Sequence, residues 1–394
     1  MQENMYIAPL PPQLSDSNEK VVQASGQMKR VYQVWQGNNI FFLGGTFIFG
    51  PDAKSMILTI LLIVIPVVLF AAFVSQRLVN EFQHHLGNLI VGIAVVFTIY
   101  VIFLLLLTSS RDPGIIPRNK RPPELEDDDV SNLSWAGSHG GLSSVPPFKD
   151  VIVNGYIIRV KYCHTCMLYR PPRCSHCSIC NNCVDRFDHH CPWVGQCIGK
   201  RNYRCFYMFV SSATILCLYV LVFCCVNLKR IIDIYECNLL EALLKSPVSG
   251  ILILYTFVVV WFVGGLTGFH TYLICSNQTT YENFRYRYDG KINPYSHGCG
   301  RNVKEILFSR IPKSKNDFRA KVEEDVYLFP SLSFGRAISQ DTAKTSFDLE
   351  MGGKCHELAS EELEDAQSQI NSVVVLERCA TQPLHTSLGS FKET

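Results

Sequence analysis

Cysteine and histidine side chains gather in one short segment of this 394-residue chain. Two residues separate Cys163 from Cys166, and two separate Cys177 from Cys180. This spacing lets both thiolates of a pair reach one tetrahedral zinc ion, and it is typical of metal sites rather than of disulfides. Two structural zinc sites would need eight ligands. The segment offers thirteen: Cys163, His164, Cys166, Cys174, His176, Cys177, Cys180, Cys183, His189, His190, Cys191, Cys197 and Cys205.

A metal would also supply folding energy that this segment lacks, because it holds few large apolar side chains and structural zinc stabilises such folds outright. A RING arrangement fits poorly, since only seven residues separate Cys166 from Cys174. We therefore expect bound zinc, and a chain without metal here is the poorer interpretation.

One tetrapeptide in the segment, Asp188-His189-His190-Cys191, has the composition of a nucleophilic site. A cysteine attacks as the thiolate, a histidine can take its proton, and an aspartate can orient and charge-stabilise that histidine. The alternative is that Cys191 is one more zinc ligand. Spacing alone does not decide between these roles, nor does it separate Cys174 and Cys205 from Cys191.

The elements that must carry this segment are strongly apolar. Each of four stretches has the length of about 20 residues that a helix needs to cross a bilayer, and none contains Lys, Arg, Asp or Glu. We therefore predict an α-helical integral membrane protein. The four predicted transmembrane helices are Ser55–Val74, Leu89–Leu107, Phe206–Val226 and Gly250–Ile274.

Composition excludes several classes of protein. Hydrophobic residues make up 48% of the chain and charged residues only 18%, which is below the roughly 25% of average soluble proteins. The net charge of +2, from 36 basic and 34 acidic residues, excludes a globally basic nucleic-acid binder. The apolar stretches exclude a disordered chain and a small disulfide-rich scaffold.

Basic residues predict the orientation. Four spans place both termini and the segment between spans two and three on one side. The loop 75–88 holds one basic residue, Arg77, whereas segment 108–205 is rich in Arg and Lys. The positive-inside rule therefore puts the termini and the cysteine cluster in the cytosol. Residues 1–39 show no signal peptide, and we expect the plasma membrane or an endomembrane (Golgi, ER or vesicles).

Polar segments flank the spans. The run Asn39–Gly50 is too short to cross a bilayer and suits the interface. Residues 131–147 are rich in Ser, Gly and Pro and predict a mobile loop. Asn154-Gly155 between two β-branched runs predicts a hairpin. The tail beyond Ser314 is expected to be largely disordered, with a short helix near 360–370.

The cysteine segment resembles the DHHC cysteine-rich domain of protein S-acyltransferases, which are membrane-bound palmitoyltransferases. The run from Cys163 to Trp193 matches C-x2-C-x7-C-x-H-C-x2-C-x2-C-x4-D-H-H-C-P-W. The flanks agree: Asp112-Pro113-Gly114 is similar to the DPG motif of the family, and Thr279-Thr280-Tyr281-Glu282 to its TTxE motif. Asn293–Gly298 with Asn302 resembles a conserved C-terminal segment, and Gly37–Asp52 is similar to plant members. The resemblance covers residues 37–311.

The resemblance implies a role for each site residue. One zinc would be held by Cys163, Cys166, His176 and Cys183, and a second by Cys177, Cys180, His190 and Cys197. Cys191 would accept the acyl group, His189 would be its base, and Asp188 would orient that base. Cys174 and Cys205 have no implied role. Gln196 stands where many relatives have Asn, which affects only a local hydrogen bond.

The implied reaction moves a long-chain acyl group, palmitoyl, from acyl-CoA to Cys191 and then to cysteine thiols of membrane-associated proteins. Cys191 lies shortly before the third span, so the nucleophile is expected at the cytosolic membrane face. Lys200, Arg201 and Arg204 are candidates for binding the CoA phosphates. The rival function is a non-enzymatic zinc-domain scaffold. A transporter would usually need ionisable groups inside the spans, and only His270, near an end, qualifies.

These inferences divide the chain into seven parts. The parts are an N-terminal arm with an interfacial segment (1–54), helices one and two (55–107), a linker and hairpin (108–160), the zinc domain (161–205), helices three and four (206–274), the TTxE and C-terminal motifs (275–312) and a cytosolic tail (313–394).

Overall fold

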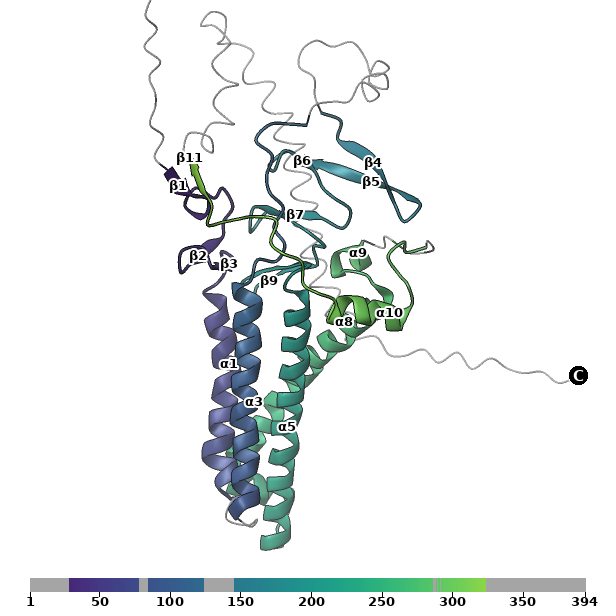
Figure 1. The fold of residues 1–394 in the computed structure, drawn as a ribbon. Helices are drawn as coiled ribbons and strands as arrows, with labels where there is room; N and C mark the ends of the chain where they lie inside the picture. The colour runs from purple at the N-terminus through teal and green to yellow at the C-terminus, as the bar shows by residue number, and fades with distance from the viewer. Residues whose placement is uncertain are drawn as a thin grey trace, which may run out of the picture.

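Long helices form one half of the molecule, and short strands cap one end of them (Figure 1). The computed structural model describes residues 28–77, 84–123, 145–285, 288, 290 and 292–323. Four helical segments are long and apolar enough to cross a membrane, which confirms the predicted number of candidate spans. They extend over Ser55–Arg77, Gly87–Ser110, Tyr203–Tyr235 and Pro247–Ser276.

Two of these segments contain a π-helical turn. The first consists of α1 (Ser55–Leu69) and the turn η2 (Phe70–Val74). The fourth consists of α7 (Pro247–Val259), the turn η3 (Val260–Gly264) and α8 (Gly265–Ser276). The second and third are α3 (His84–Ser110) and α5 (Tyr203–Tyr235).

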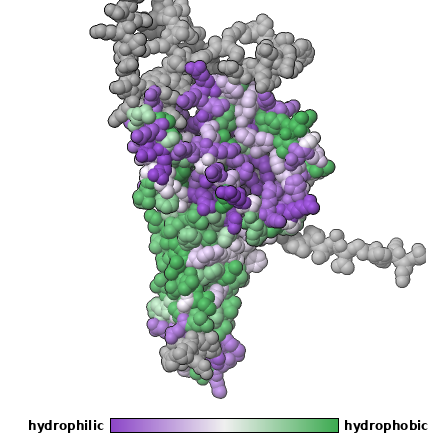
Figure 2. Space-filling model, viewed as in Figure 1, coloured by the Kyte–Doolittle hydropathy of each residue, from purple (hydrophilic) through white to green (hydrophobic). Residues whose placement is uncertain are grey.

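The helical half carries its apolar residues on the outside as well as inside. Figure 2 shows hydrophobic residues over this half and hydrophilic ones over the strand end. Val96, Leu254 and Trp261 are each more than 60% exposed. A helix that is hydrophobic all round suits a lipid environment. The buried side of the helices forms one core cluster, to which Phe70, Leu105, Phe206 and Leu252 belong.

Helix α5 continues to Tyr235, well beyond the predicted end at Val226. Its extension is stabilised by packing, because Leu228 and Ile231 are buried against the short helix α6 (Leu239–Lys245). The side chain of the buried Asn227 donates hydrogen bonds to the hydroxyls of Ser246 and Ser249. The apolar run therefore underestimates the length of α5, because contacts with α6 and with Ser246 and Ser249 stabilise its polar last turns.

The strand region lies between α3 and α5 in the sequence. Its first hairpin pairs β4 (Phe148–Val153) with β5 (Tyr156–Cys163) around Asn154-Gly155. Both turn residues have positive φ angles, 49° and 82°, as the favoured two-residue hairpin turn requires. The predicted hairpin is confirmed. The linker residues 124–144, which include most of the predicted mobile loop, lie outside the described residues.

Three further hairpins follow, each held in antiparallel register. Strand β5 also pairs with β6 (Leu168–Tyr169). Next, β7 (Ser175–Cys177) pairs with β8 (Asn182–Val184), and β9 (His189–Cys191) pairs with β10 (Gln196–Ile198). These hairpins carry the predicted metal ligands from Cys163 to Cys197 together with His189 and Cys191, and Asp188 directly precedes β9.

The N-terminal arm and the first residues of the predicted tail, up to Glu323, pack together. Strand β1 (Met28–Arg30), followed by the turn η1 (Val31–Gln33), pairs with β11 (Lys321–Glu323). Phe318, only 5% exposed, packs edge-on against Trp35. These aromatic contacts hold the segment around Phe318 against the N-terminal arm. Residues 324–394, including the helix expected near 360–370, lie outside the described residues.

Two other segments complete the strand end. The predicted interfacial run contains the hairpin of β2 (Ile40–Phe42) and β3 (Phe47–Phe49). After α8 come α9 (Thr280–Phe284), α10 (Cys299–Val303) and the π-helical turn η4 (Lys304–Phe308). Both described ends of the chain therefore lie at the same end of the helices as the cysteine segment (Figure 1).

Candidate functional site

Two groups of cysteine and histidine side chains meet in the strand region, and both have the membership that the resemblance implies. In each group the possible ligand atoms all lie within 4.8 Å of one another. The first group is Cys163, Cys166, His176 and Cys183, and the second is Cys177, Cys180, His190 and Cys197.

The hairpin register explains how the groups form. Each combines a C-x2-C turn from one hairpin with a His and a Cys that face each other across the next. His176 is the cross-strand partner of Cys183, and His190 that of Cys197. Hairpin β7–β8 therefore contributes to both groups, because its strands carry ligands of the first and its turn begins with Cys177 of the second. The two sites are linked into one unit.

The interatomic distances fit zinc. Zn–S bonds of about 2.3 Å and Zn–N bonds of about 2.0 Å at a tetrahedral angle separate sulfur from nitrogen by about 3.5 Å. The His176 Nδ1 atom lies 3.6, 3.5 and 3.7 Å from the Sγ atoms of its three cysteines. The corresponding distances from His190 Nδ1 are 3.8, 3.4 and 3.6 Å. Three thiolates and one imidazole also form a donor set that favours zinc over hard cations.

Asp52 supports the second group in a way that the spacing of cysteines does not reveal. Its Oδ2 atom lies 3.0 Å from His190 Nε2. A carboxylate on the far nitrogen fixes the tautomer and the orientation of a ligating histidine. The position was visible only as part of the Gly37–Asp52 segment that is similar to plant members.

The other histidine of the tetrapeptide faces away from the metal groups and pairs with Asp188. His189 Nδ1 lies 2.7 Å from Asp188 Oδ2. The Asp188 carboxylate is 1% exposed and accepts two more hydrogen bonds, from the Thr280 backbone N–H (2.9 Å) and hydroxyl (2.8 Å). The fold therefore separates the two adjacent histidines, which spacing alone left undecided.

Hydrogen bonding sets the protonation of this pair. Burial works to raise the pKa of Asp188, but the hydrogen bond from His189 and the charges around it lower that pKa to about 2. Burial works in the opposite direction on His189, yet its bonds with Asp188 and then Cys191 raise its pKa to about 10. Both shifts favour an ionised Asp188 carboxylate paired with a protonated His189 beside the Cys191 sulfur. This is the charge state in which the proton of the thiol would already reside on His189.

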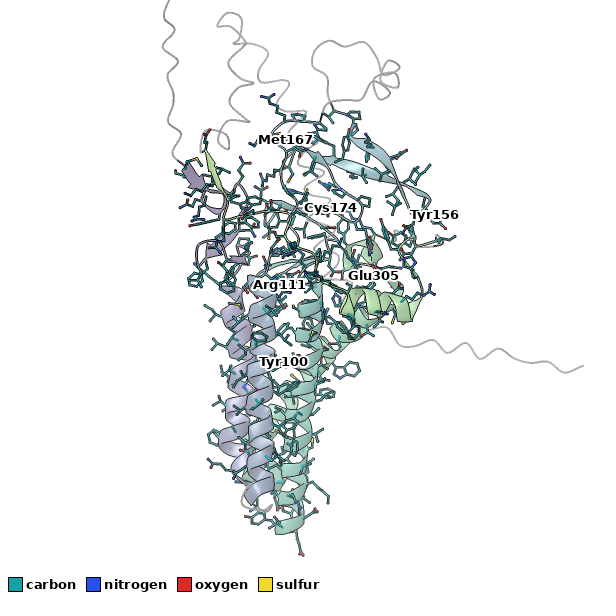
Figure 3. All side chains as sticks on the ribbon, viewed as in Figure 1. Tyr100, Arg111, Tyr156, Met167, Cys174 and Glu305 are labelled. Atoms are coloured by element: carbon teal, nitrogen blue, oxygen red, sulfur yellow. The ribbon has the colours of Figure 1, made fainter. Side chains whose placement is uncertain are left out.

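Cys191 belongs to neither metal group among the described residues. Its side chain is 6% exposed and lies in the core cluster of the helices, with Val194, Ile198 and Phe206. The thiol therefore sits where the strand region meets the helical half. Figure 3 labels Arg111 at this junction, just beyond α3, and Tyr100 farther along the same helix.

The turn after Cys191 is fastened to the helix ends by side-chain hydroxyls. Ser55 donates to the Pro192 carbonyl, Thr59 to the Trp193 carbonyl (2.8 Å), and Ser109 to the Val194 carbonyl (2.8 Å). Gly195 closes the turn with φ +75°, and a Cβ atom there would lie 2.6 Å from the Asp52 carbonyl oxygen. The turn after Cys191 is therefore held in place by helices α1 and α3 as well as by the hairpin of β9 and β10.

Gln196 retains a specific role although many relatives have Asn at this position. Its fully buried side-chain amide donates to the carbonyls of Ser109 and Arg111, both at 2.8 Å. These are carbonyls at the end of α3 that the helix itself leaves unpaired. The local hydrogen bond that the sequence put in doubt is present in this form.

Three residues of the TTxE motif, Thr279, Thr280 and Glu282, each form a different contact. Thr279 caps α9 together with Glu282, and Thr280 holds Asp188. Glu282, 2% exposed, forms a two-pronged ion pair with Arg173, with distances of 2.9 and 2.7 Å. The motif therefore joins the end of the fourth span to the hairpins that carry the site.

His270 lies closer to the site than the sequence indicated. Its ring is 1% exposed, and its Nδ1 atom lies 3.0 Å from the Tyr203 hydroxyl. Its ring centroid is 6.0 Å from that of His189. It is satisfied by this hydrogen bond, and no spacing signal predicted that the fold brings it beside the Asp188–His189 pair.

The three cations predicted to bind CoA phosphates have different surroundings. Arg201 pairs with Asp112 at 2.7 Å, which fixes the Asp112-Pro113-Gly114 turn against the start of α5. Lys200 is 3.5 Å from Asp185, a carboxylate that Lys315 also approaches. Arg204 is half-buried near the start of α5. Arg201 is therefore engaged inside the protein.

A basic cavity lies elsewhere, and sequence reasoning missed it. Its volume is about 260 Å³, and it is lined by Phe148, Arg159, Val160, Lys161, Arg170, Pro171, Pro172, Arg173, Cys174, Tyr281 and Arg285. Tyr281 follows Thr280, the partner of Asp188, so the cavity adjoins the site. Its cations come from three separate segments, which is why no single run in the sequence revealed it. Cys174, without a role so far, is half-buried in its wall.

Comparison with known proteins agrees with this geometry. The family model for DHHC palmitoyltransferase matches residues 157–287. Probable protein S-acyltransferase 7 of Arabidopsis thaliana is 56% identical over 350 residues, which is 89% of this chain and 77% of that protein. Probable protein S-acyltransferase 6 is 57% identical over 82% of this chain and 78% of its own length, and protein S-acyltransferase 8 is 51% identical over 82% of each chain.

These similarities extend over more of the chain than the motifs between residues 37 and 311. The chain therefore belongs to the DHHC palmitoyltransferase family, which confirms the prediction of an acyltransferase enzyme over that of a non-enzymatic scaffold.

Proposed function

We propose that this protein moves a long-chain acyl group, such as palmitoyl, from acyl-CoA to cysteine thiols of membrane-associated proteins through a thioester on Cys191. The observation that carries the proposal is the 2.7 Å contact between Asp188 and His189 beside Cys191. Among the described residues, the Cys191 thiol is part of neither group of potential metal ligands. A thiol, a base and an orienting carboxylate in this order form an activated nucleophile.

The reaction has two balanced steps. In the first, the Cys191 proton resides on His189, the thiolate attacks the acyl-CoA carbonyl, and CoA leaves as a thiolate that takes this proton from His189, which leaves the imidazole neutral for the second step. In the second, a protein thiol passes its proton to His189 and attacks the Cys191 thioester, and the Cys191 thiolate leaves. Asp188 stays ionised throughout and stabilises the imidazolium. The Thr280 backbone N–H donates to its Oδ1 and the Thr280 hydroxyl to its Oδ2, and both bonds favour the carboxylate.

We further propose that the two ligand groups each hold one structural zinc ion. Bound zinc would supply folding energy and fix the hairpins. His190 and Cys191 are neighbours on strand β9. A zinc ion held by His190 would therefore also fix the position of Cys191. Asp52 orients His190 from the N-terminal arm.

The position of Cys191 in the core cluster suits an acyl chain that stays among the helices. Keeping a methylene group away from water is worth about 0.8 kcal/mol. A chain bound from the apolar side is therefore strongly favoured over one that crosses water to reach the thiol.

The basic cavity is the better candidate for the CoA phosphates than Lys200, Arg201 and Arg204. Lys161, Arg170 and Arg285 border it together with Arg159, which also pairs with Asp150. The buried Nε atom of Arg170 has no hydrogen-bond partner among the described residues, and a phosphate oxygen would satisfy it. Arg201 is already paired with Asp112.

We place the termini and the hairpins on the cytosolic side, at the plasma membrane or an endomembrane (Golgi, ER or vesicles). The positive-inside rule supports this orientation, because the loop 75–88 carries a single basic residue. Acyl-CoA and the cysteines of cytosolic protein segments would then reach the site from the same side.

Steady-state kinetics test the proposal. The purified full chain, incubated with palmitoyl-CoA and a cysteine peptide, should release CoA and show parallel double-reciprocal lines, the pattern of a ping-pong reaction. A chain that binds palmitoyl-CoA without releasing CoA would contradict the proposal, and intersecting lines would contradict the Cys191 intermediate.

A further inference from the structure

Two cysteines outside the site lie in contact where the fourth span ends. Cys275 is in the last turn of α8, and Cys299 is the first residue of α10, which lies beside α8 (Figure 1). Their Sγ atoms are 2.6 Å apart. Cys275 is half-buried and Cys299 is exposed. Neither belongs to a potential metal-ligand group among the described residues.

Other contacts bring the two thiols together. The fully buried side chain of Asn302, in the same helix as Cys299, donates to the Cys275 carbonyl at 2.7 Å and to the Ser296 hydroxyl at 3.1 Å. It also accepts a hydrogen bond from the His297 backbone N–H. The thiols are therefore held close without a covalent bond, so forming one adds little loss of chain entropy.

The pair is adjacent to residues that position the site. Asn277, two residues after Cys275, is fully buried and has φ +49°. Its side chain donates to the Tyr295 carbonyl and accepts hydrogen bonds from Arg173 and Arg186. A bond between Cys275 and Cys299 would fasten α10 to the segment that leads through Asn277 to Thr280.

We propose that Cys275 and Cys299 form a reversible redox site, which closes to a disulfide in response to hydroperoxides. The exposed Cys299 thiolate attacks the peroxide O–O bond and becomes a sulfenic acid while water or an alcohol leaves. The Cys275 thiol then attacks that sulfur, the S–S bond forms, and the hydroxyl group leaves as water. A dithiol reductant returns two electrons and two protons and restores both thiols.

This proposal rests on the geometry of the two cysteines and not on the proposed acyl transfer. Six of the cysteines between Cys163 and Cys197 lie in the two proposed zinc groups, where bound metal would protect their thiolates from oxidation. Oxidation by a hydroperoxide should therefore select Cys275 and Cys299, because an exposed thiol with a second thiol in contact is the most readily oxidised arrangement.

Peptide mass spectrometry tests the proposal directly. The full-length, metal-loaded protein is treated with hydrogen peroxide, alkylated, digested and analysed, with zinc measured in parallel. We expect a Cys275–Cys299 linked peptide that dithiothreitol removes, with unchanged zinc content. In Cys275→Ser the link should be absent and Cys299 should become labelled by the sulfenic acid reagent dimedone.

A matched control uses the exposed Cys225 of α5. Cys225→Ser should still form the linked peptide at the wild-type yield. The proposal is overturned if both Cys275 and Cys299 are fully alkylated after oxidation, or if Cys299 links to a different cysteine. Acyl groups on Cys299 that hydroxylamine removes, in place of a bond that dithiothreitol removes, would also overturn it.

Discussion

Thr280 donates two hydrogen bonds to the Asp188 carboxylate, one from its backbone N–H at 2.9 Å and one from its hydroxyl at 2.8 Å. Asp188 belongs to the hairpin region between the second and third spans, whereas Thr280 follows the fourth. The contact therefore couples the Asp188–His189 pair to the end of a helix far away in sequence. It also gives the second threonine of the TTxE motif a role distinct from that of the first, which caps α9.

Replacing Thr280 by Val should slow acylation of Cys191 without unfolding the protein. A hydrogen bond to a charged group contributes about 1.5–3 kcal/mol, so we expect the acylation rate to fall by about ten-fold or more. Stopped-flow measurement of CoA release gives this rate. Thr271→Val serves as the control, because among the described residues the hydroxyl of Thr271 forms hydrogen bonds only with Tyr207 and the α8 backbone. Equal rates in both variants would show that the hydroxyl does not position Asp188.

The ion pair between Arg173 and Glu282 should be essential for stability. Arg173→Met leaves the Glu282 carboxylate buried and unpaired, and such a loss costs about 3–5 kcal/mol. We expect a clear drop in the thermal midpoint of the detergent-solubilised protein. The double variant Arg173→Met/Glu282→Gln removes the stranded charge and should recover part of the loss. A double variant less stable than either single one would contradict this account of the pair.

Asp52 should control how firmly the second metal group holds its ion. Removing the partner of a ligating histidine typically costs 10- to 100-fold in metal affinity. Asp52→Asn should therefore lose one of its metal ions to a chelator faster than wild type, which a colorimetric zinc assay can follow. Asp233→Asn, which breaks only an exposed ion pair with Lys229, should behave like wild type. Release of both ions at an equal rate would argue against a specific action on His190.

Much of this arrangement could be predicted because its signals are local. Four uncharged runs predict the spans, and Asn154-Gly155 predicts its hairpin from turn chemistry alone. The C-x2-C pairs predict metal binding, but only the resemblance to a family assigned His190 to metal and His189 to Cys191. The register of β9 with β10, which places His190 opposite Cys197, supplies the physical reason.

Other features depend on contacts between distant segments, which spacing does not encode. The pairing of β1 with β11 joins the two ends of the described chain. The link from Asp52 to His190, the ion pair of Arg201 with Asp112, and the cations around the basic cavity each join separate parts of the sequence. Helix α5 extends beyond the end of its apolar run for a similar reason, because α6 packs against its last turns.

The CoA phosphates could bind in the basic cavity or at the three cations near α5, and the two sites predict different effects of mutation. If the cavity binds the phosphates, Arg170→Ala should raise the KM for palmitoyl-CoA about ten-fold, because one charge-assisted hydrogen bond is lost. Lys200→Ala should leave that KM near the wild-type value. Initial rates of CoA release at varied palmitoyl-CoA concentration measure both. The reverse pattern would move the phosphates to the predicted site at Lys200 and Arg204.

The most direct test concerns the single thiol on which the mechanism depends. Purified wild-type protein and Cys191→Ser are incubated with palmitoyl-CoA, and peptide mass spectrometry locates any acyl group that hydroxylamine removes. The account predicts such a group on the Cys191 peptide of the wild type, and none in the variant, which should keep its zinc and its folded state. A variant that still carries a labile acyl group and transfers it to protein substrates at the wild-type rate would contradict the account.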